Sequence, residues 1–228
     1  MSTTYPHHRR RLKKSFKIAI GLVCALLVIG GATAAYFLWH SANPALKDTP
    51  GYSVEIPDWI DQNLLPINEY SRPGEPLPEV NGIVIHYVGN PGTSAKANRD
   101  YFANLAVTHE TSVSSHFLVG LEGEILQCVP LSEISYCSNT RNYDTIAIEV
   151  CHPDETGEFS QETLESVERL TAWLCAAFDL STEQVIRHYD VTGKICPKYY
   201  VEHEDAWSDL LAGVASEIPS FAQASGEG

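Results

Sequence analysis

The sequence predicts an α/β fold, in which a single, mainly twisted, mixed β-sheet is flanked by helices and preceded by one N-terminal transmembrane helix. Three observations predict it. Segments typical of strands and of helices interleave along residues 52–216, which is the pattern of a layered α/β domain. The 228 residues are 44% apolar and 19% charged, which excludes a disordered or collagen-like chain. An uncharged run near the N-terminus is long enough to cross a bilayer.

That uncharged run is Ile18–Trp39, and a helix of this length rises far enough, at about 1.5 Å per residue, to cross a hydrocarbon core of about 30 Å. A basic cluster precedes it, so the positive-inside rule predicts that residues 1–17 are a cytoplasmic tail and that the body lies outside the membrane. The alternative is a cleaved signal peptide, because Ala32-Thr33-Ala34 resembles a cleavage site. The body is then either anchored in the cell membrane or secreted.

The charge of the body excludes one class of partner. The whole chain has 15 basic and 29 acidic residues, and the basic cluster before residue 18 contains no acid. The remainder is therefore more acidic than the net charge of −14 suggests. Because proteins bind nucleic acid largely by neutralising phosphates with Lys and Arg, we expect no nucleic acid partner.

The ends of the body are rich in residues that oppose regular structure. Residues 40–51 contain Pro44, Pro50 and Gly51, which predicts a linker. Residues 217–228 are mostly small and polar, which predicts a flexible tail. The folded domain is therefore expected to cover residues 52–216.

The first half of the domain shows a strand, a helix and a hairpin. Gly82–Tyr87 is a β-branched apolar run typical of a buried strand. Residues 94–106 begin with a hydroxyl and carry apolar residues at helical spacing. Residues 115–120 and 124–129 flank a short connection that contains Gly123, which predicts a hairpin.

The second half of the domain also alternates between predicted strands and helices. Thr145–Cys151 predicts a strand with Glu149 on the face opposite Ile146 and Ile148. Ser160 is a candidate cap for a long amphipathic helix that extends to Phe178. A strand over residues 184–188 and an amphipathic helix around residues 207–214 complete the expected elements.

Five cysteines follow Cys24, which lies in the apolar N-terminal run. Export permits disulfides, although a body of this size can form a core without them. Cys128 and Cys137 flank one short loop between strands, and we expect them to pair. Cys151 and Cys175 are expected to be buried free thiols.

Three features predict a metal centre. His86 ends the first strand, Glu149 is an acid within an apolar strand, and His188 precedes Cys196 by eight positions. Each feature is unspecific alone, but two imidazoles and a thiolate supply three ligands for Zn²⁺ and leave a fourth position for water. That arrangement is typical of a catalytic zinc site rather than a structural one.

These residues, together with Ser115-His116-Phe117 and Lys194, make residues 52–212 resemble a known family. It is the type 2 class of zinc-dependent N-acetylmuramoyl-L-alanine amidases, which is related in fold to the phage T7 lysozyme amidase and the peptidoglycan recognition proteins. The resemblance implies that His86, His188 and Cys196 bind zinc. It also implies that Glu149 and Lys194 are catalytic and that peptidoglycan is the substrate.

The chemistry implied by the resemblance follows from the residue types. Zinc polarises the scissile amide and acidifies its water. Glu149 then accepts a proton and later delivers it to the leaving amine, while Lys194 faces the oxyanion.

Three further residues are expected to line the substrate cleft. Asn90 and Thr93 follow the first strand directly, and His116 begins a later one. Binding residues gather on such loops at the rim of a sheet. The chain departs from the resemblance at one place, because many relatives carry Trp-His-Ala where it has Tyr136-Cys137-Ser138.

Two other functions fit the same fold. The domain could bind or sense peptidoglycan without hydrolysing it, but non-catalytic proteins of this fold usually lack the last metal ligand, and Cys196 is present. It could also hydrolyse a different amide of the wall, which product analysis would distinguish.

Overall fold

The fold is built on two central parallel strands, β2 (Gly82–Tyr87) and β5 (Thr145–Val150), which pair along their whole length. The computed structural model describes residues 44–224 and arranges six strands in the order β1-β4-β3-β5-β2-β6. Of the strand pairs in this part of the chain, only β3 with β4 runs antiparallel. The predicted mixed sheet is therefore confirmed. The other strands are β1 (Asp61–Gln62), β3 (Phe117–Val119), β4 (Ile125–Gln127) and β6 (Val185–Arg187).

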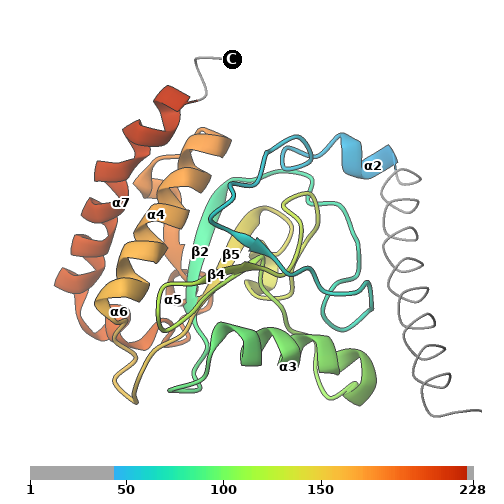
Figure 1. Cartoon of the computed structure of the whole chain (residues 1–228), viewed down its shortest axis with the longest axis horizontal. Helices are drawn as coiled ribbons and strands as arrows, with labels where there is room; N and C mark the ends of the chain where they lie inside the picture. Colours follow the sequence, from blue (N-terminus) through green and yellow to red (C-terminus); the bar gives the residue numbers. More distant parts are fainter. Residues whose placement is uncertain (1–43, 225–228) are drawn as a thin grey trace, which may run out of the picture. The chain divides into compact units, whose positions relative to one another are not determined.

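Helices cover both faces of the sheet. Helices α4 (Gln161–Phe178) and α7 (Glu204–Ala224) lie side by side (Figure 1), and both contribute to the larger apolar core. Helix α3 (Ala95–Thr108) contributes to the smaller core on the other face. The shorter helices are α2 (Pro44–Lys47), η1 (Asn139–Arg141), η2 (Thr182–Gln184), α5 (His188–Thr192) and α6 (Lys198–Glu202).

The long helices begin where the sequence predicts. The side chain of Ser94 accepts a hydrogen bond from the N–H of Ala97, and that of Ser160 accepts one from the N–H of Thr163. Each cap therefore satisfies one of the amide donors that a helix start leaves unpaired. Helix α3 extends two residues beyond the predicted end and terminates at His109, which adopts the left-handed conformation.

Successive side chains of β2 and β5 point to opposite faces of the sheet, so the residues of the core and those of the candidate site lie on different faces. Ile85 and Ile148 belong to the core beneath α4 and α7. His86 and Glu149, the next residues along each strand, project to the opposite face because strand side chains alternate. The register pairs His86 directly with Glu149.

The expected linker does not extend to residue 51. Helix α2 lies within it, Leu46 is fully buried, and the hydroxyl of Thr49 donates to the carbonyl of Leu46 at 2.7 Å. A Cβ at Gly51 would lie only 2.2 Å from the carbonyl oxygen of Leu131. Burial of an apolar side chain and close backbone approach therefore make this segment part of the body, which begins at Ala45.

The expected tail is also shorter than predicted. Helix α7 continues through Pro219 to Ala224. Proline removes one helical hydrogen bond, but Ile218 and Phe221 extend the apolar stripe against the core. The ring of Phe221 lies 6.3 Å from that of Trp59.

No helix within residues 44–224 is both long and apolar enough to cross a membrane. The predicted transmembrane segment, residues 18–39, lies outside the described residues, as does Cys24.

Candidate metal centre

The candidate site lies where three parallel strands end. Strand β2 lies between β5 and β6, so the carboxyl ends of all three meet at one edge of the sheet, where α/β proteins commonly bind ligands. His86 and Glu149 are the penultimate residues of β2 and β5, and His188 follows β6 directly. The rings of His86 and His188 lie 4.6 Å apart between centroids.

Cys196 reaches the site through a tight loop after α5. Gly193 ends that helix with a φ of 77°, a left-handed conformation that glycine adopts without strain. The N–H of Tyr189 then donates to the carbonyl of Cys196 at 2.9 Å, which draws the loop back toward His188. The thiol sulfur of Cys196 lies 3.9 Å from Nδ1 of His86.

The three predicted ligands converge as expected. One ligand atom from each of His86, His188 and Cys196 lies within 4.8 Å of the other two, and all three residues are buried. Nδ1 of His188 is buried without a hydrogen-bond partner among residues 44–224. An unpaired buried nitrogen costs free energy unless a ligand takes its lone pair.

Burial sets the protonation of these ligands. It lowers the pKa of both histidines, and the positive charge of Lys194 lowers each further. The imidazoles are therefore neutral at pH 7, as metal ligation requires. Burial also raises the pKa of the Cys196 thiol to about 12, with Glu149 adding to the effect, so a metal ion must displace the thiol proton on binding.

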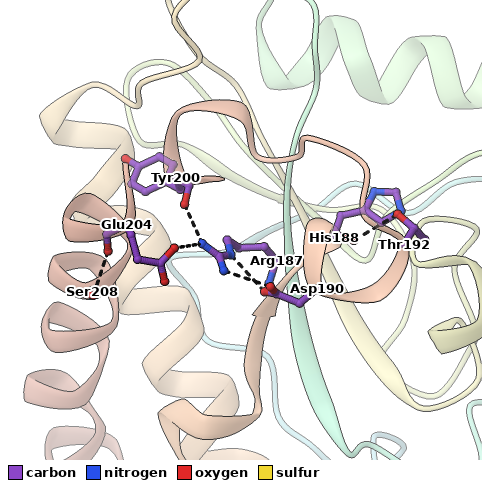
Figure 2. A network of polar contacts seen from close by, with 7 residues as sticks. All are labelled: Arg187, His188, Asp190, Thr192, Tyr200, Glu204 and Ser208. Carbon is purple, nitrogen blue, oxygen red and sulfur yellow. Dashed lines mark hydrogen bonds and ion pairs between the residues drawn. The ribbon is translucent and has the colours of Figure 1, made fainter. Parts of the chain in front are cut away.

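Arg187 fixes the strand end that carries His188 (Figure 2). Its guanidinium donates to Asp190 on α5 at 3.0 Å, to the carboxylate of Glu204 on α7 at 2.7 Å, and to the carbonyl of Tyr200 on α6 at 3.0 Å. It also lies over the ring of Trp207, 5.3 Å from the centroid. One buried side chain thus joins β6 to the three helices that follow it.

Glu149 faces the same site with one oxygen unpaired. Oε1 accepts a hydrogen bond from the thiol of Cys137 at 3.5 Å, whereas Oε2 is buried without a partner in the described part of the chain. Burial raises the pKa of Glu149 to about 8, although the Cys137 thiol and Lys194 oppose the rise. A carboxyl group with a pKa near neutrality is suited to accept and return a proton.

Lys194 lies on the exposed loop between Gly193 and Cys196. Its positive charge acts on Glu149, His86 and His188. The structure therefore brings His86, Glu149, His188 and Cys196 together, and it places Lys194 on the loop that leads to Cys196.

The donor set fits zinc. Two imidazole nitrogens and one sulfur are ligands that Zn²⁺ prefers, and three protein ligands leave a fourth position open. The buried, unpaired Nδ1 of His188 is the observation that favours a ligand at this point.

A cavity of about 340 Å³ opens beside Glu149. Its lining includes Asn90 and Thr93, for which the sequence predicts a substrate-binding role, and Asn98 and Tyr101 of α3. A larger cavity of about 760 Å³ borders Trp59 and α4, but none of the predicted site residues lines it. We therefore assign the cavity beside Glu149 as the candidate substrate cleft.

The prediction that His116 lines the cleft is wrong. Its ring is fully buried, Nε2 bonds to the carbonyl of Glu133 at 2.9 Å, and Nδ1 accepts from the N–H of Ala147 at 3.0 Å. Both ring nitrogens thus have backbone partners from other segments. His116 joins those segments to β3 and has no free nitrogen for a substrate.

The prediction of a Cys128–Cys137 disulfide is also wrong, because both cysteines are free thiols. Cys128 lies in the core beneath α3, whereas Cys137 contacts Glu149. The spacing of the pair along the chain gave no sign of these separate surroundings. Cys151 and Cys175 are buried free thiols, as predicted.

Cys137 is one site residue that the sequence did not predict. Its sulfur, a nitrogen of His86 and an oxygen of Glu149 all lie within 4.8 Å of one another. The only signal in the sequence was the departure from Trp-His-Ala at positions 136–138.

Comparisons with known proteins identify the family of this chain. The family model described as N-acetylmuramoyl-L-alanine amidase matches residues 76–199. The amidase CwlL of Bacillus licheniformis is 35% identical over 155 residues, which are 62% of this chain and 42% of CwlL. The amidase BlyA of Bacillus subtilis is 31% identical over 177 residues, 68% of this chain and 47% of BlyA. The matched part thus covers less than half the length of these curated relatives.

The fold agrees as well. The solved catalytic domain of XlyA, an amidase of Bacillus subtilis, superposes with a TM-score of 0.58 at 28% identity and covers 68% of this chain and 98% of that domain. The structure of PlyL gives the same TM-score at 20% identity, and at this identity the match shows only that the fold is shared. With the family model spanning more than half of the sequence, this chain belongs to the N-acetylmuramoyl-L-alanine amidase family.

Proposed function

We propose that this protein is a zinc-dependent peptidoglycan hydrolase that cleaves the amide between N-acetylmuramic acid and the L-alanine of the stem peptide. The observation that carries the proposal is the convergence of His86, His188 and Cys196 beside a carboxylate with an unpaired oxygen. Membership of the amidase family supports the reaction, and the names of the relatives support the substrate.

Each residue of the site has a proposed role that follows from its position. His86, His188 and Cys196 would hold Zn²⁺, which when bound supplies a Lewis acid for the amide carbonyl and acidifies water. Glu149 would accept the proton of the attacking water at Oε2, the oxygen that has no partner among the described residues, and return it to the leaving amine. Lys194, two residues before Cys196, would stabilise the negative charge that develops on the carbonyl oxygen.

The cleft would hold the substrate beside these groups. Asn90, Thr93 and Asn98 offer amide and hydroxyl groups to a glycopeptide, and Tyr101 offers an aromatic face. The wall of the cavity therefore combines hydrogen-bonding side chains with apolar surface, as ligand sites commonly do.

Product analysis tests this function. Full-length protein in detergent is incubated with purified peptidoglycan, and the products are identified by mass spectrometry. We expect free muramoyl ends together with peptides that begin with L-alanine, and we expect a zinc chelator to abolish both. Products of cleavage at a different amide would show that the enzyme acts on another bond of the wall. Binding of peptidoglycan without cleavage would indicate a sensing module.

We further propose that Ile18–Trp39 anchors the protein in the cell membrane, with residues 1–17 in the cytoplasm and the amidase domain outside. The support is the uncharged run and the basic cluster before it. Full-length protein should then remain in membranes after salt and carbonate washing and should be cleaved by external protease. A soluble form that begins near Ala35 would show that the segment is a cleaved signal peptide.

A further inference from the structure

Three consecutive residues each contact a different residue of the candidate centre. The thiol of Cys137 donates to Oε1 of Glu149 at 3.5 Å. The hydroxyl of Ser138 lies 3.2 Å from Nε2 of His86. The side-chain oxygen of Asn139 lies 2.8 Å from Nε2 of His188. We call residues 137–139 the strap.

The strap is held in place by its own backbone contacts. The side-chain oxygen of Asn142 accepts from the N–H of Cys137 at 3.1 Å and from the N–H of Ser138 at 2.7 Å. The hydroxyl of Ser114 accepts from the N–H of Tyr136, just before the strap, at 3.0 Å. Asn139 has a φ of 55°, a left-handed conformation that asparagine adopts more readily than most residues other than glycine.

The strap determines which histidine nitrogens are available. A neutral imidazole carries its proton on one nitrogen and a lone pair on the other. The amide oxygen of Asn139 can only accept, so Nε2 of His188 carries the proton and the unpaired Nδ1 carries the lone pair. If Ser138 accepts from Nε2 of His86 in the same way, the lone pair of His86 is on Nδ1, which lies 3.9 Å from the sulfur of Cys196.

The strap also orients the carboxylate. Because the Cys137 thiol engages Oε1 of Glu149, the other oxygen is left as the acceptor. A single short segment thus acts on both ligand histidines and on the proposed proton acceptor.

We propose that Cys137, Ser138 and Asn139 are positioning residues, which hold His86 and His188 as Nδ1 ligands and present Oε2 of Glu149 to the reaction. The proposal deepens the proposed function and rests on it for the identity of the metal.

Zinc affinity tests the two histidine contacts. It is measured for the full-length protein in detergent by competition with a chromophoric chelator. Loss of a group that orients a metal ligand commonly weakens metal binding about 10–100-fold, and we expect this for Ser138→Ala and for Asn139→Gly. The glycine keeps the left-handed backbone accessible, so the variant should fold. Asn139→Asp keeps an oxygen acceptor and should restore affinity to within about threefold of the parent.

Two control variants match these changes. Ser115→Ala removes a buried hydroxyl that bonds only to the carbonyl of Phe117 among the contacts described. Asp179→Gly changes another residue with a left-handed backbone, at the end of α4. Both should leave zinc affinity unchanged. Equal affinity in the parent, Ser138→Ala and Asn139→Gly would overturn the proposal.

A spectroscopic measurement reports the protonated nitrogen directly. In ¹⁵N spectra of histidine-labelled, zinc-loaded protein, His86 and His188 should both show Nε2–H and metal-bound Nδ1. Ser138→Ala should make the Nε2 proton of His86 exchange faster and leave that of His188 unchanged, and Asn139→Gly should do the reverse. Ligation through Nε2 in the parent would refute the assignment.

The Cys137 contact is tested by turnover. Cys137→Ala should lower kcat about tenfold, the worth of one modest hydrogen bond, with KM and zinc affinity unchanged. Cys137→Ser should recover most of the loss, because its hydroxyl can donate to the same oxygen. An unchanged kcat for Cys137→Ala would remove Cys137 from the proposal.

Failure of this proposal is distinct from failure of the proposed function. In one outcome the parent binds zinc and releases peptides that begin with L-alanine, and the variants have the same zinc affinity as the parent. The proposed function then stands, and the positioning role of the strap is refuted. In the other outcome the parent releases no such peptides, but the variants bind zinc more weakly than the parent does. The positioning role of the strap then stands, and the proposed function is refuted.

Discussion

Two groups of buried polar side chains, one in the segments around β3 and one at the carboxyl ends of β5 and β6, differ in one respect. Around β3, His116 has partners for both ring nitrogens, and the guanidinium of Arg72 forms two 2.7 Å bonds to the carboxylate of Glu133. At the ends of β5 and β6, Glu149 and His188 each keep one buried atom without a partner among residues 44–224. Burial alone therefore does not distinguish a structural group from a functional one. An unpaired buried atom indicates a site only where candidate ligands converge beside it, because Oγ1 of Thr171 and Nε2 of His152 are also buried without a partner among the described residues.

The energetics give this difference meaning. A buried donor or acceptor without a partner costs about 1–3 kcal/mol, and a ligand or a water molecule that supplies the missing partner offsets this cost. A fully paired group rigidifies the interior but offers nothing to a ligand. The two groups should therefore differ in what the protein loses when a member of each is changed.

Removal of two ligands should have the largest effect. The parent should hold about one zinc per chain and the double variant His188→Ala, Cys196→Ala none, because one imidazole cannot retain the metal alone. Elemental analysis of the purified full-length protein measures this. His203→Ala, which changes an exposed histidine, and His116→Gln should both keep their zinc. Loss of zinc from His116→Gln would break the comparison between the two groups.

Glu149→Gln should lower turnover on peptidoglycan about 10²–10⁴-fold, the usual loss when a general acid–base group is removed. The amide keeps the shape of the carboxyl group but cannot accept the proton, so zinc content and melting temperature should stay close to those of the parent. Glu165→Gln, at an exposed position on α4, is the matched control. Turnover at the parent rate would make Glu149 a structural acid.

Arg72→Met should lower the free energy of unfolding by about 3–5 kcal/mol, since it leaves the buried carboxylate of Glu133 without its cation. Denaturant unfolding of the zinc-loaded protein measures the change. Lys96→Met removes a pair whose side chains are 74% and 51% exposed and should cost less than about 1 kcal/mol. Similar losses in the two variants would contradict the contrast between buried and exposed pairs.

The strands that carry the site could be predicted because their signals are local. The β-branched runs before His86 and around Glu149 specify buried strands by composition alone, and the spacing of His188 and Cys196 is compatible with one loop. The pairing of His86 with Glu149 could not be read from sequence, because it depends on the register of strands about sixty residues apart.

The errors share a physical cause. His116 is distinguished from the ligand histidines by partners at Glu133 and Ala147, which only the folded chain brings to it. Cys128 and Cys137 lie close in sequence but enter different surroundings. Strand β1 has two exposed residues, too few for an alternating pattern. Burial of Leu46 and of the end of α7 depends on surfaces formed elsewhere in the chain.

Acid should reveal the structural histidine. Burial lowers the pKa of His116 to about 4, although its bond to the carbonyl of Glu133 opposes the shift. Nδ1 accepts from the N–H of Ala147, so a proton placed there would meet another donor. In the unfolded chain the pKa returns to about 6.5, and the unfolded state therefore binds a proton first as the pH falls.

His116 should thus stabilise the fold fully above pH 6.5, and this contribution should be lost as the pH falls toward 4, by at most about 3 kcal/mol. The measurement is the difference in unfolding free energy between the parent and His116→Gln at several values of pH. Glutamine does not titrate, and taking the difference cancels groups common to both proteins. The parent should therefore lose its advantage over His116→Gln between pH 6.5 and 4. An advantage that stays constant over this range would mean that His116 does not remain neutral in the fold, and the contrast with the candidate ligands would then rest on the unpaired Nδ1 of His188 alone.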